Sequence, residues 1–393
     1  MVQFLLTRIP RELEGGQSWP QPPFRRPGPA ESRLRAELPA LQFVESYRLS
    51  AWATLILLLL APASAGARTK AKTPAAGDAP YLEMDGGRRL QFERSFQSER
   101  EVKIKRGFWT KLIDFAAGAP DYKSLVRPYS LTADSRERII LTDPGASGVH
   151  IFDFAQQKYK FITHLEGKDE MHAPMCVAVD KLDNIYVTDS DAGKIFVFGA
   201  NGKFQRVIGS LRGGEGIFKR PTGIAVDSDA QQIFVSDTWR GKIYVLDMQG
   251  SVVRTIGKRG EANGEFNFPT ELRLDGPDLI VVDAMNFRVQ VLDRAGSFRY
   301  AIGRPGEGGG DLYRPKGIGL DAEGHLYVAD AFYNIVQVFD REGRLLYYFG
   351  KDAGVGDFKL PAGLALDRSD RIYVVDTYHR RVQVFHYFAG GAR

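Results

Sequence analysis

The chain has 393 residues, of which 44% are hydrophobic and 26% charged, a composition typical of a folded protein with a sizeable core. Its single cysteine, Cys176, excludes an intramolecular disulfide and a cysteine-based zinc site such as that of a RING module. The net charge of +5 is mild for this length and gives little support for an anionic partner such as nucleic acid.

The N-terminal part of the chain predicts export. Residues 49–67, LSAWATLILLLLAPASAGA, follow Arg48 and combine an apolar run with small residues suited to a cleavage site. The most apolar part is much shorter than the about 20 residues that span a bilayer, which favours a cleaved signal peptide over an uncleaved membrane anchor. We therefore expect a periplasmic, secreted or membrane-anchored protein.

The segments on either side of this signal predict no domain of their own. Residues 1–48 are rich in Pro, Arg and Glu without periodicity, which indicates a disordered extension or a misassigned start near Val44. Residues 68–106 are expected to form a linker and a segment that precedes the folded domain, beginning with a flexible tether over 68–80.

From Leu125 onward, six similar segments follow one another. Each begins with a proline that is followed by small and apolar residues, as in FKRPTGIAVD (218–227), and the prolines are 46 to 48 residues apart: Pro128, Pro174, Pro221, Pro269, Pro315 and Pro361. A second marker, an aspartate, lies 14 to 16 residues later in each segment: Asp143, Asp189, Asp237, Asp283, Asp330 and Asp376. A period in the forties with several short apolar runs per unit predicts the blades of a β-propeller.

The third unit shows the expected blade most clearly. Its four apolar runs, at 222–226, 232–236, 242–247 and 251–256, are separated by Asp, Gly, Ser and Asn, which favour turns. The sixth unit ends with RVQVFHYF (381–388) and lacks a fourth run. GFWTKLIDFAAG (107–118) resembles the fourth run of other units, so we expect 108–116 to complete the last blade and the propeller to extend over 107–388.

The repeat resembles the NHL repeat, most clearly in GGEGIFKRPTGIAVD and GVGDFKLPAGLALD. This resemblance covers about 280 residues. It implies an all-β, six-bladed propeller and says little about activity, because NHL propellers include lyases, RNA-binding proteins and protein-interaction modules.

Two rings of residues are expected at one end of the propeller, here called the loop face. The alternating strand directions bring the loop that enters the first strand and the loop between the second and third strands to the same end. The inner ring follows the prolines and contains Tyr129, Glu271 and Lys316. The outer ring follows the aspartates and contains aromatic and basic residues: Trp239, Arg240, Phe332, Tyr333, Tyr378, His379 and Arg380.

Several of these residues have a plain structural explanation. The marker aspartates recur in every unit, which favours turn capping over a carboxylate ring that binds metal. Cys176 is expected to be a small buried residue. Some outer-ring side chains are expected to pack between blades, and Glu271 with Lys316 can be a hydrated pair or can bind a polar ligand at the channel mouth.

The resemblance also permits a test for one enzyme class. NHL propellers that resemble peptidyl-hydroxyglycine lyases place zinc-binding histidines directly after the proline in several blades. No histidine occupies that position here, so we expect no metal site and no cofactor.

We therefore expect an exported, monomeric propeller that binds a protein or an extracellular ligand through its loop face, without catalysis. The binding residues would be those of the outer ring together with Tyr129, Glu271 and Lys316. The alternative is an enzyme of lyase or hydrolase type, with Tyr129, His172, Glu271 or Lys316 at the channel mouth. A third candidate is RNA binding by the same face, which the charge of about +3 outside residues 1–65 disfavours.

Overall fold

The computed structural model describes residues 80–84, 87–102, 122–163, 165, 170–211, 216–351, 353 and 355–388, all within one compact unit, Thr73–Arg393. The predicted extension 1–48, the signal segment 49–67 and the predicted closing strand 108–116 lie outside the described residues. In the described part of the chain, no helix is long and apolar enough to cross a membrane.

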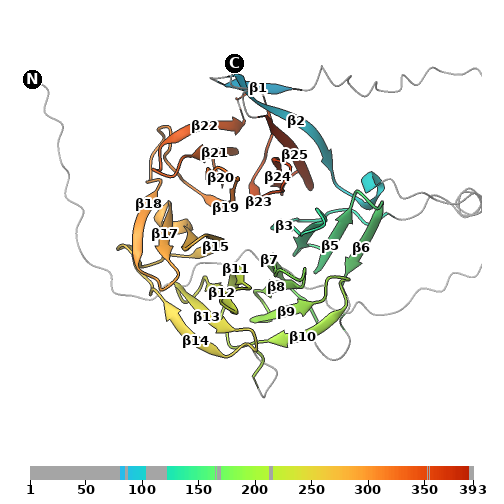
Figure 1. Ribbon diagram of the computed structural model, residues 1–393, viewed down its shortest axis with the longest axis vertical. Coiled ribbons are helices and arrows are strands. Elements are labelled where there is room, and N and C mark those ends of the chain that lie inside the picture. The colour runs from blue at the N-terminus through green and yellow to red at the C-terminus, as the bar shows by residue number, and fades with distance from the viewer. Residues whose placement is uncertain are drawn as a thin grey trace, which may run out of the picture. The chain divides into compact units, whose positions relative to one another are not determined.

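Six antiparallel sheets form a closed ring around a central axis (Figure 1), which confirms the predicted all-β, six-bladed propeller. The first three blades contain, from the axis outward, β3 (Leu131–Ala133), β4 (Ile139–Asp143), β5 (Gly148–Asp153) and β6 (Lys158–Ile162); β7 (Pro174–Val179), β8 (Ile185–Asp189), β9 (Lys194–Phe198) and β10 (Phe204–Ile208); and β11 (Pro221–Asp227), β12 (Gln232–Asp237), β13 (Lys242–Asp247) and β14 (Val252–Ile256).

The other three blades continue this order. They contain β15 (Pro269–Asp275), β16 (Asp278–Asp283), β17 (Arg288–Asp293) and β18 (Phe298–Ile302); β19 (Pro315–Leu320), β20 (Leu326–Asp330), β21 (Ile335–Phe339) and β22 (Leu345–Gly350); and β23 (Pro361–Leu366), β24 (Arg371–Asp376) and β25 (Arg381–Phe388), which share a sheet with β1 (Tyr81–Met84) and β2 (Arg88–Phe96). Two short 3-10 helices, η2 (Glu99–Val102) and η3 (Ala284–Asn286), lie in connections.

The burial of each strand follows its position in the blade. Second and third strands such as β8 and β9 are buried along their whole length, because both faces of a blade pack against neighbouring blades. The outermost strand alternates between exposed and covered residues, as in β6. The hydrophobic core is thus a series of clusters between adjacent blades rather than one central core.

The ring is closed by a strand from the N-terminal part of the chain, as predicted, but that strand is β2 and not 108–116. Residues of β2 pair with β25 from Arg89 opposite Phe388 to Phe96 opposite Val382. Leu90 and Phe96 bury their side chains completely. The propeller therefore begins before the predicted boundary at residue 107, because the segment RRLQFERSF carries the strand that fills the open edge of the last blade.

The marker aspartates hold the loop face together. All six are fully buried at the end of the second strand of their blade. The carboxylate of Asp189 accepts hydrogen bonds from the backbone N–H groups of His172 and Ala173, ahead of the proline, and from Asp191 and Ala192, in the next turn. These bonds confirm a turn-capping role and show that it extends to the loop that enters the inner strand.

Inner strands approach one another closely at the second residue after the proline. A Cβ atom added to Gly363 would lie 2.6 Å from Ser130 Cα and 2.7 Å from the backbone oxygen of Tyr129, in the neighbouring blade. Only glycine fits between these two backbones without a shift of one blade against the other.

Replacing Gly363 by alanine is expected to lower the free energy of unfolding by about 1–3 kcal/mol, the usual cost of overpacking a rigid site. Urea denaturation measures this loss. Gly309→Ala is the matched control, because an added Cβ there meets only the end of the Leu345 side chain. Equal stability of the two variants would show that the inner strands can move apart.

Candidate functional site

A pocket of about 470 Å³ opens at the channel mouth on the loop face. It is here called the mouth pocket. Its lining comes from the loops of two adjacent blades and from one residue of the first blade: Tyr129, Phe268, Thr270, Ala284, Met285, Phe287, Tyr313, Arg314, Pro315, Lys316 and Phe332. The volume is within the range of small-molecule sites.

One wall of the mouth pocket is a continuous row of aromatic rings. The Tyr313 ring lies 5.5 Å from that of Phe287 and 4.1 Å from that of Phe332, measured between centroids. Tyr333 meets Phe332 edge to face at 5.2 Å. Phe332 leaves 55% of its surface exposed, an unusual state for a phenylalanine in a cluster and a common one at binding sites.

Tyr129 and Lys316 form the part of the mouth pocket nearest the axis. The Lys316 ammonium lies 5.4 Å from the centroid of the Tyr129 ring, a distance that allows a cation–π interaction. Burial lowers the pKa of Lys316 to about 8, and the positive charges of Arg314 and Arg127 act in the same direction. Burial also raises the pKa of the Tyr129 hydroxyl, so the tyrosine stays neutral.

Glu271 lies below this mouth, buried in the channel. It is 2% exposed, and its Oε1 pairs with Arg273 Nη1 at 3.0 Å. The Cys176 thiol donates to Glu271 Oε2 at 3.3 Å. Burial raises the pKa of Glu271 although Arg273 opposes this, and burial together with the nearby Glu271 raises that of the thiol. Cys176 is buried, as predicted, but it is a hydrogen-bond donor as well as a packed side chain.

The Arg273 side chain, two residues further along β15, extends across the channel. Its guanidinium donates to the backbone oxygens of Leu131 at 3.4 Å and Leu364 at 3.2 Å, which belong to two other blades. The inner strand β15 therefore supplies both halves of a buried ion pair, whereas the equivalent residues of the other inner strands are neutral.

Of the predicted outer-ring residues, two lie at the mouth pocket. Phe332 lines the mouth pocket beside Tyr129 and Lys316, and Tyr333 packs against Phe332 while donating to the Gly306 backbone oxygen at 2.5 Å. The remaining predicted residues do not line this pocket: Trp239, Arg240, Tyr378, His379 and Arg380.

Two of those five residues are held by polar contacts of their side chains. Arg240 is fixed by the Asp237 carboxylate and the Ile217 backbone oxygen, and His379 Nδ1 lies 2.8 Å from an Asp376 oxygen. Trp239 and Tyr378 are 54% and 57% exposed. Arg240 and His379 are thus oriented by contacts within the fold, and Trp239, Tyr378 and Arg380 are exposed on their own blades.

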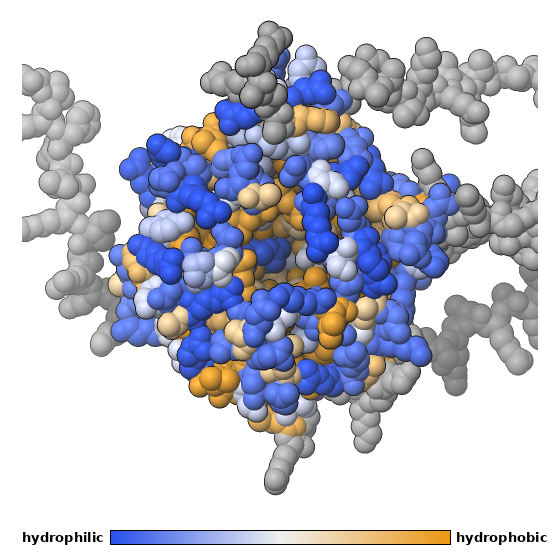
Figure 2. All heavy atoms as spheres, viewed as in Figure 1, coloured by the Kyte–Doolittle hydropathy of each residue, from blue (hydrophilic) through white to orange (hydrophobic). Residues whose placement is uncertain are grey.

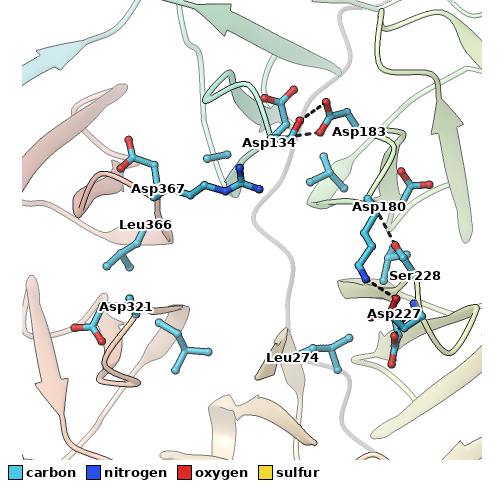
Figure 3. Close-up of a pocket in the computed structure, with 18 of the residues that line it drawn as sticks. Asp134, Asp180, Asp183, Asp227, Ser228, Leu274, Asp321, Leu366 and Asp367 are labelled. Carbon is cyan, nitrogen blue, oxygen red and sulfur yellow. Dashed lines mark hydrogen bonds and ion pairs between the residues drawn. The ribbon is translucent and has the colours of Figure 1, made fainter. Parts of the chain in front are cut away.

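The opposite end of the channel carries a larger hollow of about 690 Å³. Carboxylates from five blades surround it, with Leu274 and Leu366 on the wall (Figure 3): Asp134, Asp180, Asp183, Asp227, Asp321 and Asp367. These carboxylates are already used in turns. Asp180 Oδ1, for example, accepts from the backbone N–H groups of Leu182 and Asn184. The carboxylates around this hollow are therefore accounted for by hydrogen bonds within the fold.

The surface view shows a hollowed ring centre where hydrophobic residues surround hydrophilic ones (Figure 2). Across the described ranges, no group of three or more His, Cys, Asp or Glu side chains is placed to hold a metal ion. Two polar atoms in the channel, Ser130 Oγ and Thr270 Oγ1, are buried with no hydrogen-bond partner.

Three further residues at the mouth were not singled out from the sequence. Arg127, Arg220 and Arg314 each directly precede a marker proline, in alternate blades. The signal was present as VRP, KRP and YRP in the first, third and fifth units, but it becomes meaningful only when the ring brings the three positions around one axis.

Comparisons with known proteins agree on the fold. Residues 358–385 match the NHL repeat, and residues 132–237 and 226–286 match a six-bladed β-propeller family of unknown function. No curated protein matches the sequence. A structural genomics protein of unknown function from Bacteroides thetaiotaomicron is similar in structure, with 14% identity, a TM-score of 0.55, and coverage of 67% of this chain and 70% of that one.

Two proteins of known activity are more weakly similar. A catalytically inactive virginiamycin B lyase from Staphylococcus aureus, solved with quinupristin, has 14% identity and a TM-score of 0.49, with 68% of this chain and 85% of that chain covered. Hydrazine synthase of Kuenenia stuttgartiensis has the same identity and TM-score, with 67% and 96% covered. At this level the similarity concerns the fold alone.

Proposed function

We propose that this six-bladed β-propeller with NHL repeats is a non-catalytic binding module, which presents its loop face to a partner or an extracellular ligand. The observation that carries this proposal is the mouth pocket with its exposed aromatic wall. An aromatic row of this kind exposes apolar surface that a bound molecule would cover, and it lies on a rigid ring that needs no rearrangement to bind.

We also propose that the protein acts outside the cytoplasm. The support is the apolar segment 49–67 with its small residues, which has the pattern of a secretory signal. Fractionation of cells that produce the full chain, with an antibody against the propeller, tests this. Recovery in the cytoplasmic fraction alone would contradict it.

Replacing Phe332 and Tyr313 together by alanine is expected to weaken partner capture by about tenfold or more, because aromatic anchors at the centre of an interface carry much of the binding energy. Affinity capture from the cell envelope, quantified by mass spectrometry, identifies the partners, and titration of the purified partner gives the affinity. The full chain is used throughout.

The control is Val252→Ala with Val253→Ala, which removes exposed apolar surface from β14, away from the mouth pocket. This variant should capture the same partners as the unaltered protein. If the aromatic double variant also retained every partner at full affinity, the mouth pocket would not be the binding site.

A second candidate, an enzyme of lyase or hydrolase type, is favoured by the neighbouring Tyr129 and Lys316, because an amine with a pKa of about 8 is suited to proton transfer. Lys316→Met separates the two functions. In an enzyme this variant would abolish turnover even at ligand concentrations that saturate it, whereas in a binding module no ligand is converted by either form.

A further inference from the structure

Three arginines lie at equivalent positions on the loop face, and one of them, Arg314, lines the mouth pocket. Arg127, Arg220 and Arg314 occupy the same position in blades one, three and five, directly before the proline of the inner strand. The marker aspartate of each blade holds the backbone N–H of its arginine, at 2.9 Å for Asp143 and 3.2 Å for Asp237. The backbone positions are therefore fixed by the fold, while the guanidinium groups are left to other partners.

These guanidinium groups have no anionic partner in the described part of the chain. Each of the three arginines is exposed and makes no ion pair with a described residue. The marker carboxylates below them are buried and accept backbone hydrogen bonds. Lys316 likewise has the Tyr129 ring as its neighbour and no described carboxylate.

The charge of each of the three arginines acts on Lys316 or on Tyr129, the two residues of the mouth pocket nearest the axis. The charges of Arg127 and Arg314 reach Lys316, where they oppose its protonation, and the charges of Arg220 and Arg314 reach the Tyr129 hydroxyl. Glu271 lies beneath them, but it is occupied by Arg273 and by the Cys176 thiol. The mouth is thus a site of uncompensated positive charge.

The aromatic wall adjoins this charge. Tyr313 directly precedes Arg314, and its ring lies between those of Phe287 and Phe332. A ligand that satisfied both parts of the pocket would carry an anionic group at the axis and an apolar, preferably flat, body against the wall. Guanidinium groups suit carboxylate and phosphate oxygens, which they can contact through two parallel hydrogen bonds.

We infer that the mouth pocket binds a small amphipathic anion, with its carboxylate or phosphate held by Arg314 and Lys316 and its apolar body packed on Tyr313 and Phe332. Arg127 and Arg220, at the positions equivalent to Arg314 in two other blades, add positive charge around the same mouth. This inference rests on the proposed binding function and specifies the ligand class for that site. It requires no covalent step.

Calorimetric titration of the full chain with four defined probes tests the inference. The probes are 2-naphthoate, 1-naphthyl phosphate, uncharged 2-naphthol and inorganic phosphate. We expect at least one charged naphthyl probe to bind about tenfold or more tightly than naphthol, because each charged hydrogen bond contributes strongly in a partly buried site. Tighter binding of the naphthyl phosphate would identify a phosphate ligand, and the reverse order a carboxylate.

Variants and the pH dependence of binding show which side chains hold the charged probe. Arg314→Gln and Lys316→Met should each weaken the charged probe by about tenfold and leave naphthol unchanged. Lys181→Gln, at the opposite end of the channel and paired with Asp229, is the control and should change neither. Affinity for the charged probe should fall as the pH rises through about 8, where Lys316 loses its proton, and this step should be absent in Lys316→Met.

Two results would overturn the inference. One is equal binding of naphthol and the charged probes, unaffected by the arginine and lysine variants. The other is the absence of binding by any probe. In either case, the double variant of Phe332 and Tyr313 tests the proposed function separately. If that variant lost partner capture, the loop face would still be supported as a binding surface. If it retained capture, the proposed function would be contradicted as well.

Discussion

Replacing Phe96 by alanine is expected to lower the free energy of unfolding by about 3–5 kcal/mol, the usual cost of removing a large buried aromatic ring. Phe96 is 1% exposed, and its ring lies 4.9 Å from that of Phe152 in the first blade and 5.1 Å from that of Phe154. It therefore joins the closing strand β2 to the first blade as well as to the last, and its loss weakens the closure of the ring.

Urea denaturation followed by circular dichroism measures this effect. Ser95→Ala is the matched control, because Ser95 is an exposed neighbour in the same strand and pairs with Gln383 through its backbone only. We expect that variant to unfold like the unaltered protein. A loss below about 1 kcal/mol for Phe96→Ala would mean that β2 does not close the ring in solution.

Replacing Arg273 by alanine is expected to cost about 3–5 kcal/mol, because it leaves the buried Glu271 carboxylate without its counter-charge. Two interblade contacts, to the backbone oxygens of Leu131 and Leu364, are lost at the same time. The double variant Glu271→Gln, Arg273→Met should recover most of the loss, since no buried charge remains. Chemical denaturation of the three forms at one pH provides the comparison.

The loss of stability in Arg273→Ala should increase as the pH rises. The folded state raises the pKa of Glu271, so between the ordinary glutamate value and the raised value the folded state binds more protons than the unfolded state, and stability falls as the pH rises. Without the positive charge of Arg273, the pKa of Glu271 in the folded state rises further. The penalty of Arg273→Ala should therefore be larger near about pH 8 than near about pH 5. An equal penalty at both values would show that Glu271 is not charged in the folded protein.

The fold could be predicted from the sequence because its unit repeats. Each proline and each marker aspartate recurs in six copies, and the apolar runs between them have the length and composition of strands. The closing strand has no such copy to compare with. RRLQFERSF carries neither the proline nor the aspartate marker of the repeat, and only the open edge of β25 shows which segment fits there.

The candidate site could be predicted less completely from the sequence, because it depends on residues that depart from the repeat. Tyr129, Lys316 and Phe332 were predicted from their ring positions, and the mouth pocket brings these three together. The contact between Cys176 and Glu271 could not be anticipated, because two whole units separate the residues in sequence and the curvature of the ring alone makes them neighbours. Trp239 and Tyr378 occupy equivalent positions yet lie outside the pocket.

The shared last blade has a mechanical consequence. Both ends of the described propeller lie in one sheet, in the order β1-β2-β25. The N-terminal strand β1 pairs with β2 from Tyr81 opposite Gln91 to Met84 opposite Arg88, and β25 ends at Phe388, opposite Arg89. Tension between the two ends would first peel β1 from β2, and would then load the pairs between β2 and β25 one at a time, from Arg89 and Phe388 toward Phe96 and Val382. The ring would thus yield by unzipping at this blade, while the other five sheets carry none of the load until it has opened.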